Sequence, residues 1–276
     1  MSVPRSLLLA AVVLLAGCAG VGGSDPYTDT GAALDGDQLR ESHVENLRSA
    51  GSYTSSFNAS YVTDGSATTI NLTTRVDTET DRGLRFTRLN ASGPTVSGVL
   101  ETTAYTAGDT TYRKRTLRSA DGSTSSYDSA SAPYDGAVQP VNISAAAFAD
   151  VFGDVDRVNW TQAGVERYDG TSVTRYEAEG VEAFVDASSV AVPGSDAPPE
   201  DPSVGDGEVV EAGATLLVTG DGTVRLLEVS FVVDTDRGRT AVSYRISFEG
   251  VGSTTVEEPA WTDRAGEGQQ ASARRP

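Results

Sequence analysis

Apolar and polar positions alternate with a period of two over much of the chain. In the run from Tyr53 to Val62 the odd positions carry the aromatic side chains and most even positions are polar, and a similar alternation returns from Ile70 to Val76. Such alternation is typical of strands with one buried face. The Asp64-Gly65 pair between the two runs predicts a hairpin turn.

The pattern predicts further strands and two helices, separated by two long loops. We expect strands near residues 84–90, 95–107, 110–117, 159–168 and 171–177, and a three-stranded meander over residues 213–256. A helical period predicts one helix over 37–50, capped by Asp37 and ended by Gly51, and another over 144–152. Residues 119–140 are expected to form a loop, as is the acidic, proline-rich stretch 192–207.

Export is indicated by the first residues of the chain. A basic Arg5 precedes an apolar run at residues 7–15, which is too short to span a bilayer and has the form of a cleavable signal. The run ends in Leu15-Ala16-Gly17-Cys18, and Cys18 is the only cysteine. This sequence resembles the lipobox of prokaryotic lipoproteins, which implies that the Cys18 thiol is lipidated and that the chain is cut before it. The alternative is an ordinary secretory signal with an incidental cysteine.

These features predict a division of the chain and a location. Residues 1–17 are expected to be a signal peptide, 18–36 a lipidated cysteine with a flexible tether, 37–261 a single β-rich domain, and 262–276 a disordered tail. The expected location is the outer surface of the cell membrane, with covalently attached membrane lipid as the anchor.

The charge of the chain indicates a salt-rich habitat and argues against one class of partner. The net charge is −18, with a single lysine, Lys114, beside 20 arginines. This composition resembles that of haloarchaeal proteins, and the whole chain resembles uncharacterised haloarchaeal lipoproteins. The acidity argues against a nucleic-acid partner, which would need a basic face. Five Asn-x-Ser/Thr sequons are candidate N-glycosylation sites: Asn58, Asn71, Asn90, Asn142 and Asn159. Asn90 has the same parity as the apolar Leu84 and Phe86, which are expected to face inward. Asn90 can therefore point outward only if the third strand ends before it.

Residues for catalysis or for metal binding are scarce in the sequence. His43 is the only histidine and falls on the apolar stripe of the first predicted helix, where a packed or solvent-edge histidine is expected rather than a general base. The acidic turn 77–83 resembles a calcium loop, but its glycine is one place late and Arg88 stands where a glutamate should close the site. We therefore expect no catalytic residue, no metal and no cofactor.

The order of elements, the anchored N-terminus and the ending Val256-Glu257-Glu258-Pro259-Ala260-Trp261 resemble the LolA and LppX/LprG lipoprotein-carrier fold. That resemblance implies an α+β fold with a strongly curved antiparallel sheet, a half-open barrel whose concave face is crossed by helices over an apolar cavity. The candidate lining residues are Tyr53, Phe57, Tyr61, Ile70, Leu72, Phe231, Tyr244 and Phe248. Arg113 and Arg115 are candidate contacts for a lipid head group, with surface pairing to acids as the alternative.

Two functional hypotheses follow from these observations. The first is a surface lipoprotein that binds or carries a lipid, a lipoprotein or another apolar ligand in the half-barrel. The second is a non-catalytic envelope module, interacting or structural, whose core is filled by its own side chains. A surface hydrolase is a third and weaker option.

Overall fold

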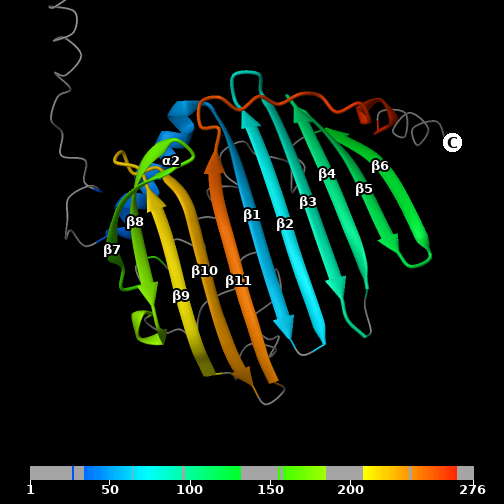
Figure 1. Cartoon of the computed structure of the whole chain (residues 1–276). Coiled ribbons are helices and arrows are strands. Elements are labelled where there is room, and N and C mark those ends of the chain that lie inside the picture. Colours follow the sequence, from blue (N-terminus) through cyan, green and yellow to red (C-terminus); the bar gives the residue numbers. More distant parts are fainter. Residues whose placement is uncertain are drawn as a thin grey trace, which may run out of the picture.

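An open antiparallel sheet of eleven strands dominates the structure, in the order β6-β5-β4-β3-β2-β1-β11-β10-β9-β8-β7 (Figure 1). This computed structural model describes residue 27 and residues 34–63, 65–94, 97–131, 155, 158–184, 208–235 and 238–265. The strands are β1 (Ser52–Thr63), β2 (Ser66–Asp77), β3 (Arg82–Ser92), β4 (Gly98–Ala107), β5 (Thr110–Ser119), β6 (Gly122–Ser131), β7 (Thr161–Tyr168), β8 (Thr171–Glu179), β9 (Glu208–Val218), β10 (Val224–Thr235) and β11 (Gly238–Glu249). The predicted fold class, α+β with an antiparallel sheet that does not close, is confirmed.

The sheet is two meanders joined at its centre. Strands β1 to β6 follow one another outward in one direction, and β11 to β7 do so in the other, with β1 paired to β11. Short turns suffice between most neighbours because every pair is antiparallel. The predicted hairpin between β1 and β2 is confirmed: Thr63 pairs with Ser66, and Gly65 has φ of +89°, which glycine adopts without strain.

Helix α2 (Gly36–Ala50) begins one residue before the predicted helix. Asp35, and not Asp37, is its N-cap, because the Asp35 carboxylate accepts a hydrogen bond from the Gln38 N–H at 2.9 Å. The predicted end is confirmed, since Gly51 takes the left-handed conformation with φ of +71° and its N–H bonds to the Arg48 carbonyl. Leu39, His43 and Leu47 form the buried stripe of α2.

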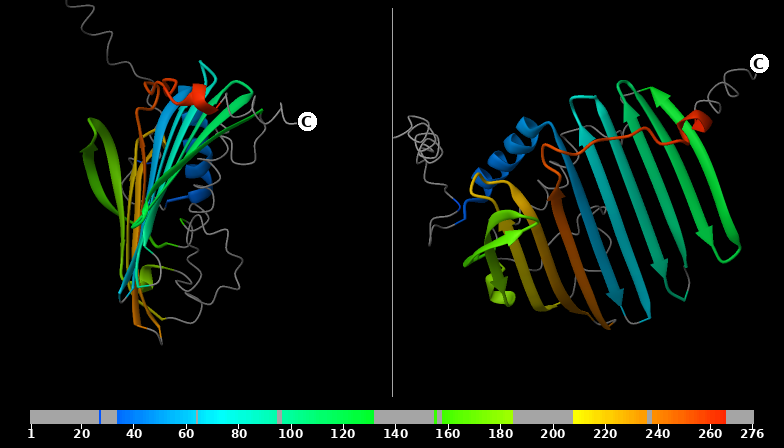
Figure 2. Two further views of the ribbon diagram at one scale, coloured as in Figure 1. Left: turned by 90° about the vertical axis from the view of Figure 1, so that its right-hand side faces the viewer. Right: turned by 45° about the horizontal axis from the view of Figure 1, so that its top comes forward.

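The sheet has two faces, which we call the helix-side face and the outer face. Figure 2 (left) shows α2 on one side of the sheet, while β7 and β8 lean toward the other. The helix-side face carries the main core, in which Tyr53, Phe248, Leu216 and Leu227 are fully enclosed. Register places alternate residues of each strand on this face, and in β10 and β11 the alternation in the sequence becomes paired apolar side chains.

On the outer face, a C-terminal segment at residues 250–265 crosses the end of the sheet from β11 to β6 (Figure 1). Its last residues form a helical turn, where the Ser129 hydroxyl donates to the Ala265 carbonyl at 3.2 Å and the Arg264 guanidinium lies over the Tyr127 ring. Tyr105 of β4 is fully buried on this face. The described chain thus continues past Trp261, where the sequence placed the end of the domain.

Two expectations about strands were wrong. Residues 122–131 form β6 and not part of a loop, because this edge strand is almost entirely polar and has no apolar face to reveal it. β3 continues past Asn90, and yet Asn90 faces outward, because Leu84 and Phe86 lie on the outer face with it. Arg85, Thr87 and Leu89 point to the helix side. The second predicted helix, the loop 192–207, Asn142 and Cys18 lie outside the described residues.

Candidate functional site

A single row of apolar side chains crosses nine strands of the helix-side face. Each member is the direct cross-strand partner of the next, from β8 through the centre of the sheet to β5. We call this the apolar row: Ala178, Ala214, Val229, Tyr244, Ala59, Ile70, Leu89, Leu100 and Leu117. At about 4.8 Å between strands, it extends over nearly 40 Å.

The apolar row is buried at one end and open at the other. Ala178, Ala214, Val229, Tyr244 and Ala59 belong to the core. Toward β5 the side chains of the row become exposed to solvent: Leu89 is 36% and Leu117 is 55% exposed. Exposed leucines in register with a buried apolar layer leave a surface on which hydrocarbon is favourably placed.

All eight candidate lining residues lie on the helix-side face. Tyr53, Phe231, Tyr244 and Phe248 are buried, and Phe57, Tyr61, Ile70 and Leu72 are half-buried. The four half-buried residues lie on β1 and β2, between the packed core and the open end of the apolar row. The sequence therefore placed these eight side chains on one face, and their contact with a ligand stays a prediction.

Under α2 the core is filled by aromatic rings. The His43 ring packs edge-on against Phe248, with ring centroids 4.4 Å apart, and Nδ1 of His43 accepts the Val224 N–H at 3.2 Å. Burial lowers the pKa of His43 from 6.5 to about 3, against a smaller opposing effect of the Asp221 charge. A neutral, enclosed imidazole in this position holds α2 on the sheet, and it is not placed to exchange protons with a substrate in solution.

Both candidate head-group residues lie on the helix-side face. Arg113 is bound to Asp128 of the neighbouring strand at 3.1 Å, so its charge is compensated. Arg115 is exposed and lies two positions before Leu117 on the same face of β5. The sequence did not single out a third cation, Arg85 of β3, which register places on this face opposite Thr74 and Ala104. Arg85 could have been found only by knowing which face of β3 is the helix-side face. The apolar Leu84 and Phe86 suggest the wrong face in the sequence.

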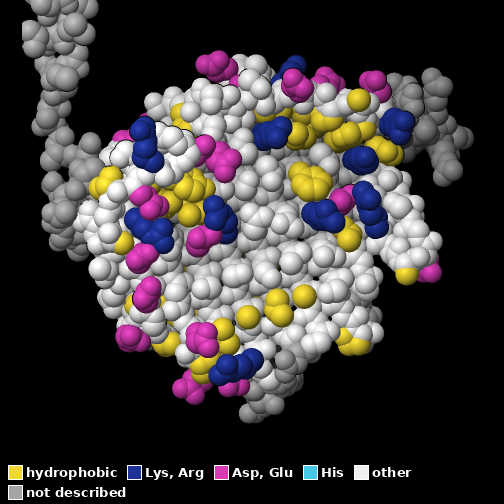
Figure 3. Space-filling model, viewed as in Figure 1, with side chains coloured by type: hydrophobic (Ala, Val, Ile, Leu, Met, Phe, Trp, Pro, Cys, Tyr) yellow, Lys and Arg dark blue, Asp and Glu magenta, His cyan; other side chains and the backbone are white. Residues whose placement is uncertain are grey.

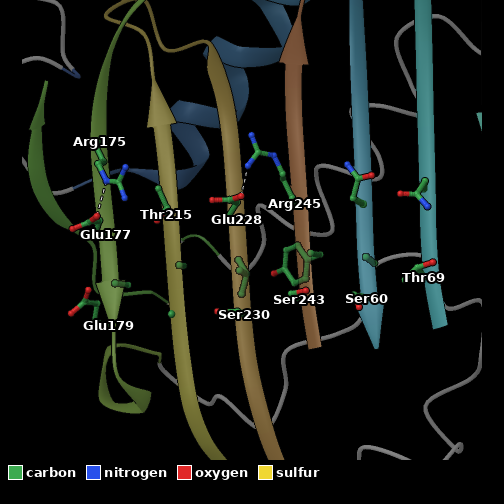
Figure 4. A pocket seen from close by; sticks show the side chains of 18 residues that line it. Ser60, Thr69, Arg175, Glu177, Glu179, Thr215, Glu228, Ser230, Ser243 and Arg245 are labelled. Carbon is green, nitrogen blue, oxygen red and sulfur yellow. Dashed lines mark hydrogen bonds and ion pairs between the residues drawn. The ribbon is translucent and has the colours of Figure 1, made fainter. Parts of the chain in front are cut away.

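The outer face carries a groove of about 560 Å³ over β8 to β2 (Figure 4). Ion pairs cross its floor: the Arg175 Nε donates to Glu177 at 2.6 Å, and Arg245 pairs with Glu228. Serine, threonine and glycine fill much of the remaining lining. Burying a hydrocarbon chain here would remove water from charged groups, so the groove does not suit an apolar ligand.

Three of the sequons share the outer face. Asn58 and Asn71 are direct cross-strand partners at the edge of the groove, and Asn90 lies on the next strand, opposite Thr69. Asn159 is exposed just before β7. The predicted outward direction of Asn58 and Asn71 fits this placement, and glycan attachment itself stays a prediction.

Basic side chains gather on the part of the outer face formed by β2 to β5 (Figure 3). Register assigns Arg75, Arg88, Lys114 and Arg118 to it, and Glu101 is shared by Arg88 at 4.0 Å and Arg118 at 2.8 Å. Residues 82–119, which form β3 to β5, hold seven basic and two acidic residues, a net charge of +5 in a chain of −18. This part of the sheet is thus net positive in a chain that is strongly acidic as a whole.

The described residues include neither a metal-binding cluster nor a membrane-spanning helix. No cluster of three or more histidine, cysteine, aspartate or glutamate side chains there is arranged to hold a metal ion. None of the helices in the same part of the chain has the length and apolar character needed to cross a bilayer.

Comparison with known proteins gives a family match and distant structural neighbours. A family model described as "Family of unknown function (DUF7537)" matches residues 5–265. The structure of LprF from Mycobacterium bovis aligns with 83% of this chain and 98% of its own, at 14% identity and a TM-score of 0.34. A LolA superfamily protein from Nitrosomonas europaea aligns with 82% and 96%, at 6% identity and a TM-score of 0.19. No curated protein matches the chain.

Proposed function

The chain belongs to DUF7537, a family of unknown function, and we propose that it is a lipid-anchored protein of the outer cell surface that binds an apolar ligand on the helix-side face of its sheet. The ligand is a lipid or another molecule with a hydrocarbon chain. Binding is non-covalent and involves no catalytic step.

The apolar row is the observation that carries this proposal. Nine directly paired apolar side chains form one line, and the line emerges from the core at Leu89 and Leu117. A hydrocarbon chain laid along the open end would cover these leucines and continue toward the half-buried Ile70 and Leu72. Each leucine removed from water in this way contributes about 1.5–3 kcal/mol.

The anchor is proposed from the sequence and brings the domain to its ligand. Lipidation of Cys18 would hold the chain at the membrane, and stable attachment requires two hydrocarbon chains, as diacylation of the thiol would provide. Residues 19–36 are rich in glycine, serine and aspartate, which suits a flexible tether. The scarcity of lysine and the charge of −18 support a high-salt habitat.

A matched pair of variants tests the binding face. The mature chain from residue 18, with Cys18→Ser so that no anchor competes, is titrated with a neutral fluorescent alkyl probe in molar salt. Leu89→Asp places a charge in the open part of the apolar row and is expected to weaken binding at least tenfold. Val62→Asp is the control, because Val62 is also an exposed apolar residue but lies on the outer face.

The two alternatives give different results. If the probe does not bind the unsubstituted domain, the envelope module with a filled core is favoured over a ligand-binding protein. If Leu89→Asp and Val62→Asp weaken binding equally, the ligand does not occupy the helix-side face.

A further inference from the structure

The open end of the apolar row lies beside uncompensated positive charge. On the helix-side face of β3 to β6 the charged residues are Arg85, Arg113, Arg115 and Asp128. Asp128 is bound to Arg113 through both carboxylate oxygens. No ion pair joins Arg85 or Arg115 to a carboxylate in the part of the chain that the structure describes. Among the described residues, these two guanidinium groups therefore have no counter-charge.

Arg85 is the less solvated of these two cations. Its cross-strand partners, Thr74 and Ala104, are buried and short, so they give the guanidinium neither a charge nor a bulky cover. Burial lowers the pKa of Arg85, which means that the surroundings oppose its charge. A half-buried cation without a partner is unfavourable, and an anion placed beside it would offset that cost.

Register fixes where such an anion would lie relative to the leucines. Arg85 and Leu89 are four residues apart on one face of β3, about 13 Å along the strand. Arg115 lies two strands from β3 and two positions from Leu117, about 7 Å along β5. Thr87 and Thr102 occupy the row between Arg85 and the leucines. A charged group at the arginines would thus leave an attached hydrocarbon chain directed over Leu89, Leu100 and Leu117.

We propose that Arg85, assisted by Arg115, binds the anionic oxygens of an amphiphile whose hydrocarbon chain lies on the apolar row. This inference rests on the proposed function and narrows the ligand to a lipid with a carboxylate or phosphate group. The planar guanidinium matches both groups, because its N–H donors form a fork that bonds two oxygens at once.

Three probes with the same chain and fluorophore test the charge requirement: a free carboxylate, its neutral methyl ester, and an alkyl phosphate. The mature chain with Cys18→Ser is expected to bind at least one anionic probe about tenfold more tightly than the ester, as a charge-assisted hydrogen bond would give. Preference for the carboxylate or for the phosphate identifies which group the site accepts. Much of the preference for anionic probes is expected to remain in molar salt, because a half-buried contact is screened less than an exposed one.

Substitutions assign the preference to residues. Arg85→Gln is expected to reduce the anionic-to-ester ratio about tenfold while the affinity for the ester stays unchanged. Arg85→Lys keeps the charge and is expected to restore part of the ratio. Arg88→Gln is the control, since it removes an equal charge from the same strand but from the outer face. Chemical denaturation of each variant confirms that it is folded before binding is compared.

The outcomes separate this inference from the proposed function. Equal binding of the ester and both anionic probes by the unsubstituted domain overturns the inference and leaves apolar binding intact. An unchanged ratio in Arg85→Gln, or an equal loss in Arg88→Gln, also overturns it. Failure of all three probes to bind contradicts the proposed function itself.

Discussion

Lowering the pH from 7 to 4 is expected to cost the fold about 3 kcal/mol through His43 alone. Burial depresses the pKa of His43 to about 3 in the folded chain, whereas the unfolded chain keeps 6.5. The unfolded state therefore binds the proton first, so the stability is fully present above pH 6.5 and is lost as the pH falls toward 3. Over most of this window the loss is about 1.4 kcal/mol per pH unit. Chemical denaturation at a series of pH values in molar salt measures it.

Carboxylates titrate in the same range, so a variant is needed to isolate His43. His43→Gln keeps a neutral acceptor for the Val224 N–H and removes the titrating ring. This variant is expected to be less stable at pH 7, because it loses the packing against Phe248, but its stability should fall less steeply below pH 6. Parallel curves for the two proteins would show that His43 is not the buried, neutral group described here.

Replacing Cys18 by serine is expected to abolish lipid attachment completely, because the chain has no other thiol. In the unsubstituted protein the N-terminal peptide should begin at residue 18 and carry the added mass of two hydrocarbon chains. In Cys18→Ser, incorporation of a labelled lipid precursor should fall to background. Mass spectrometry of the N-terminal peptide and the labelling measurement give independent readouts.

A second cysteine placed elsewhere serves as the control. The double variant Cys18→Ser, Ser24→Cys carries one thiol outside the Leu15-Ala16-Gly17 context and should remain unlabelled. A mature N-terminus at another residue, or lipid incorporation without Cys18, would mean that the apolar N-terminal run is an ordinary secretory signal.

Strong alternation predicted the centre of the sheet. β1 carries its three aromatic residues on one face, β10 presents aromatic or branched residues at every second position from Leu227 to Val233, and β11 does the same from Val242 to Phe248. The polar residues of these strands lie mainly on the other face, although Leu226 is buried there, so polarity indicates which way most side chains point. The helix was predicted for a similar reason, since Leu39, His43 and Leu47 are four residues apart and all buried.

The edge of the sheet was harder to predict because its faces are mixed. β6 has neither face buried in apolar contacts, and its serine-rich sequence is identical in character to that of a loop. β3 misleads in the opposite way, since Leu84 and Phe86 belong to the outer face and Arg85 to the helix side. Pairing between strands supplies this information, and one sequence read alone does not contain it.

The same limit applied to the candidate site. Arg113 and Arg115 were found because they are consecutive on one face of a basic strand, but the sequence could not show that Asp128 compensates only the first. The apolar row combines residues from nine strands, and six of these residues are more than 25 positions from Ile70 in the sequence. These residues form one line because of the register between the strands, and the sequence alone does not give that register.

Photo-cross-linking at residue resolution tests the central claim most directly. Intact cells that produce the unsubstituted protein are supplied with a long-chain fatty acid bearing a diazirine near its end, and adducts are located by tandem mass spectrometry. Adducts are expected on residues of the helix-side parity, Leu89, Leu100 and Leu117, and not on the outer-face neighbours Arg88 and Asn90. Adducts on both parities of β3, or confined to residues of the outer groove, would contradict binding on the helix-side face.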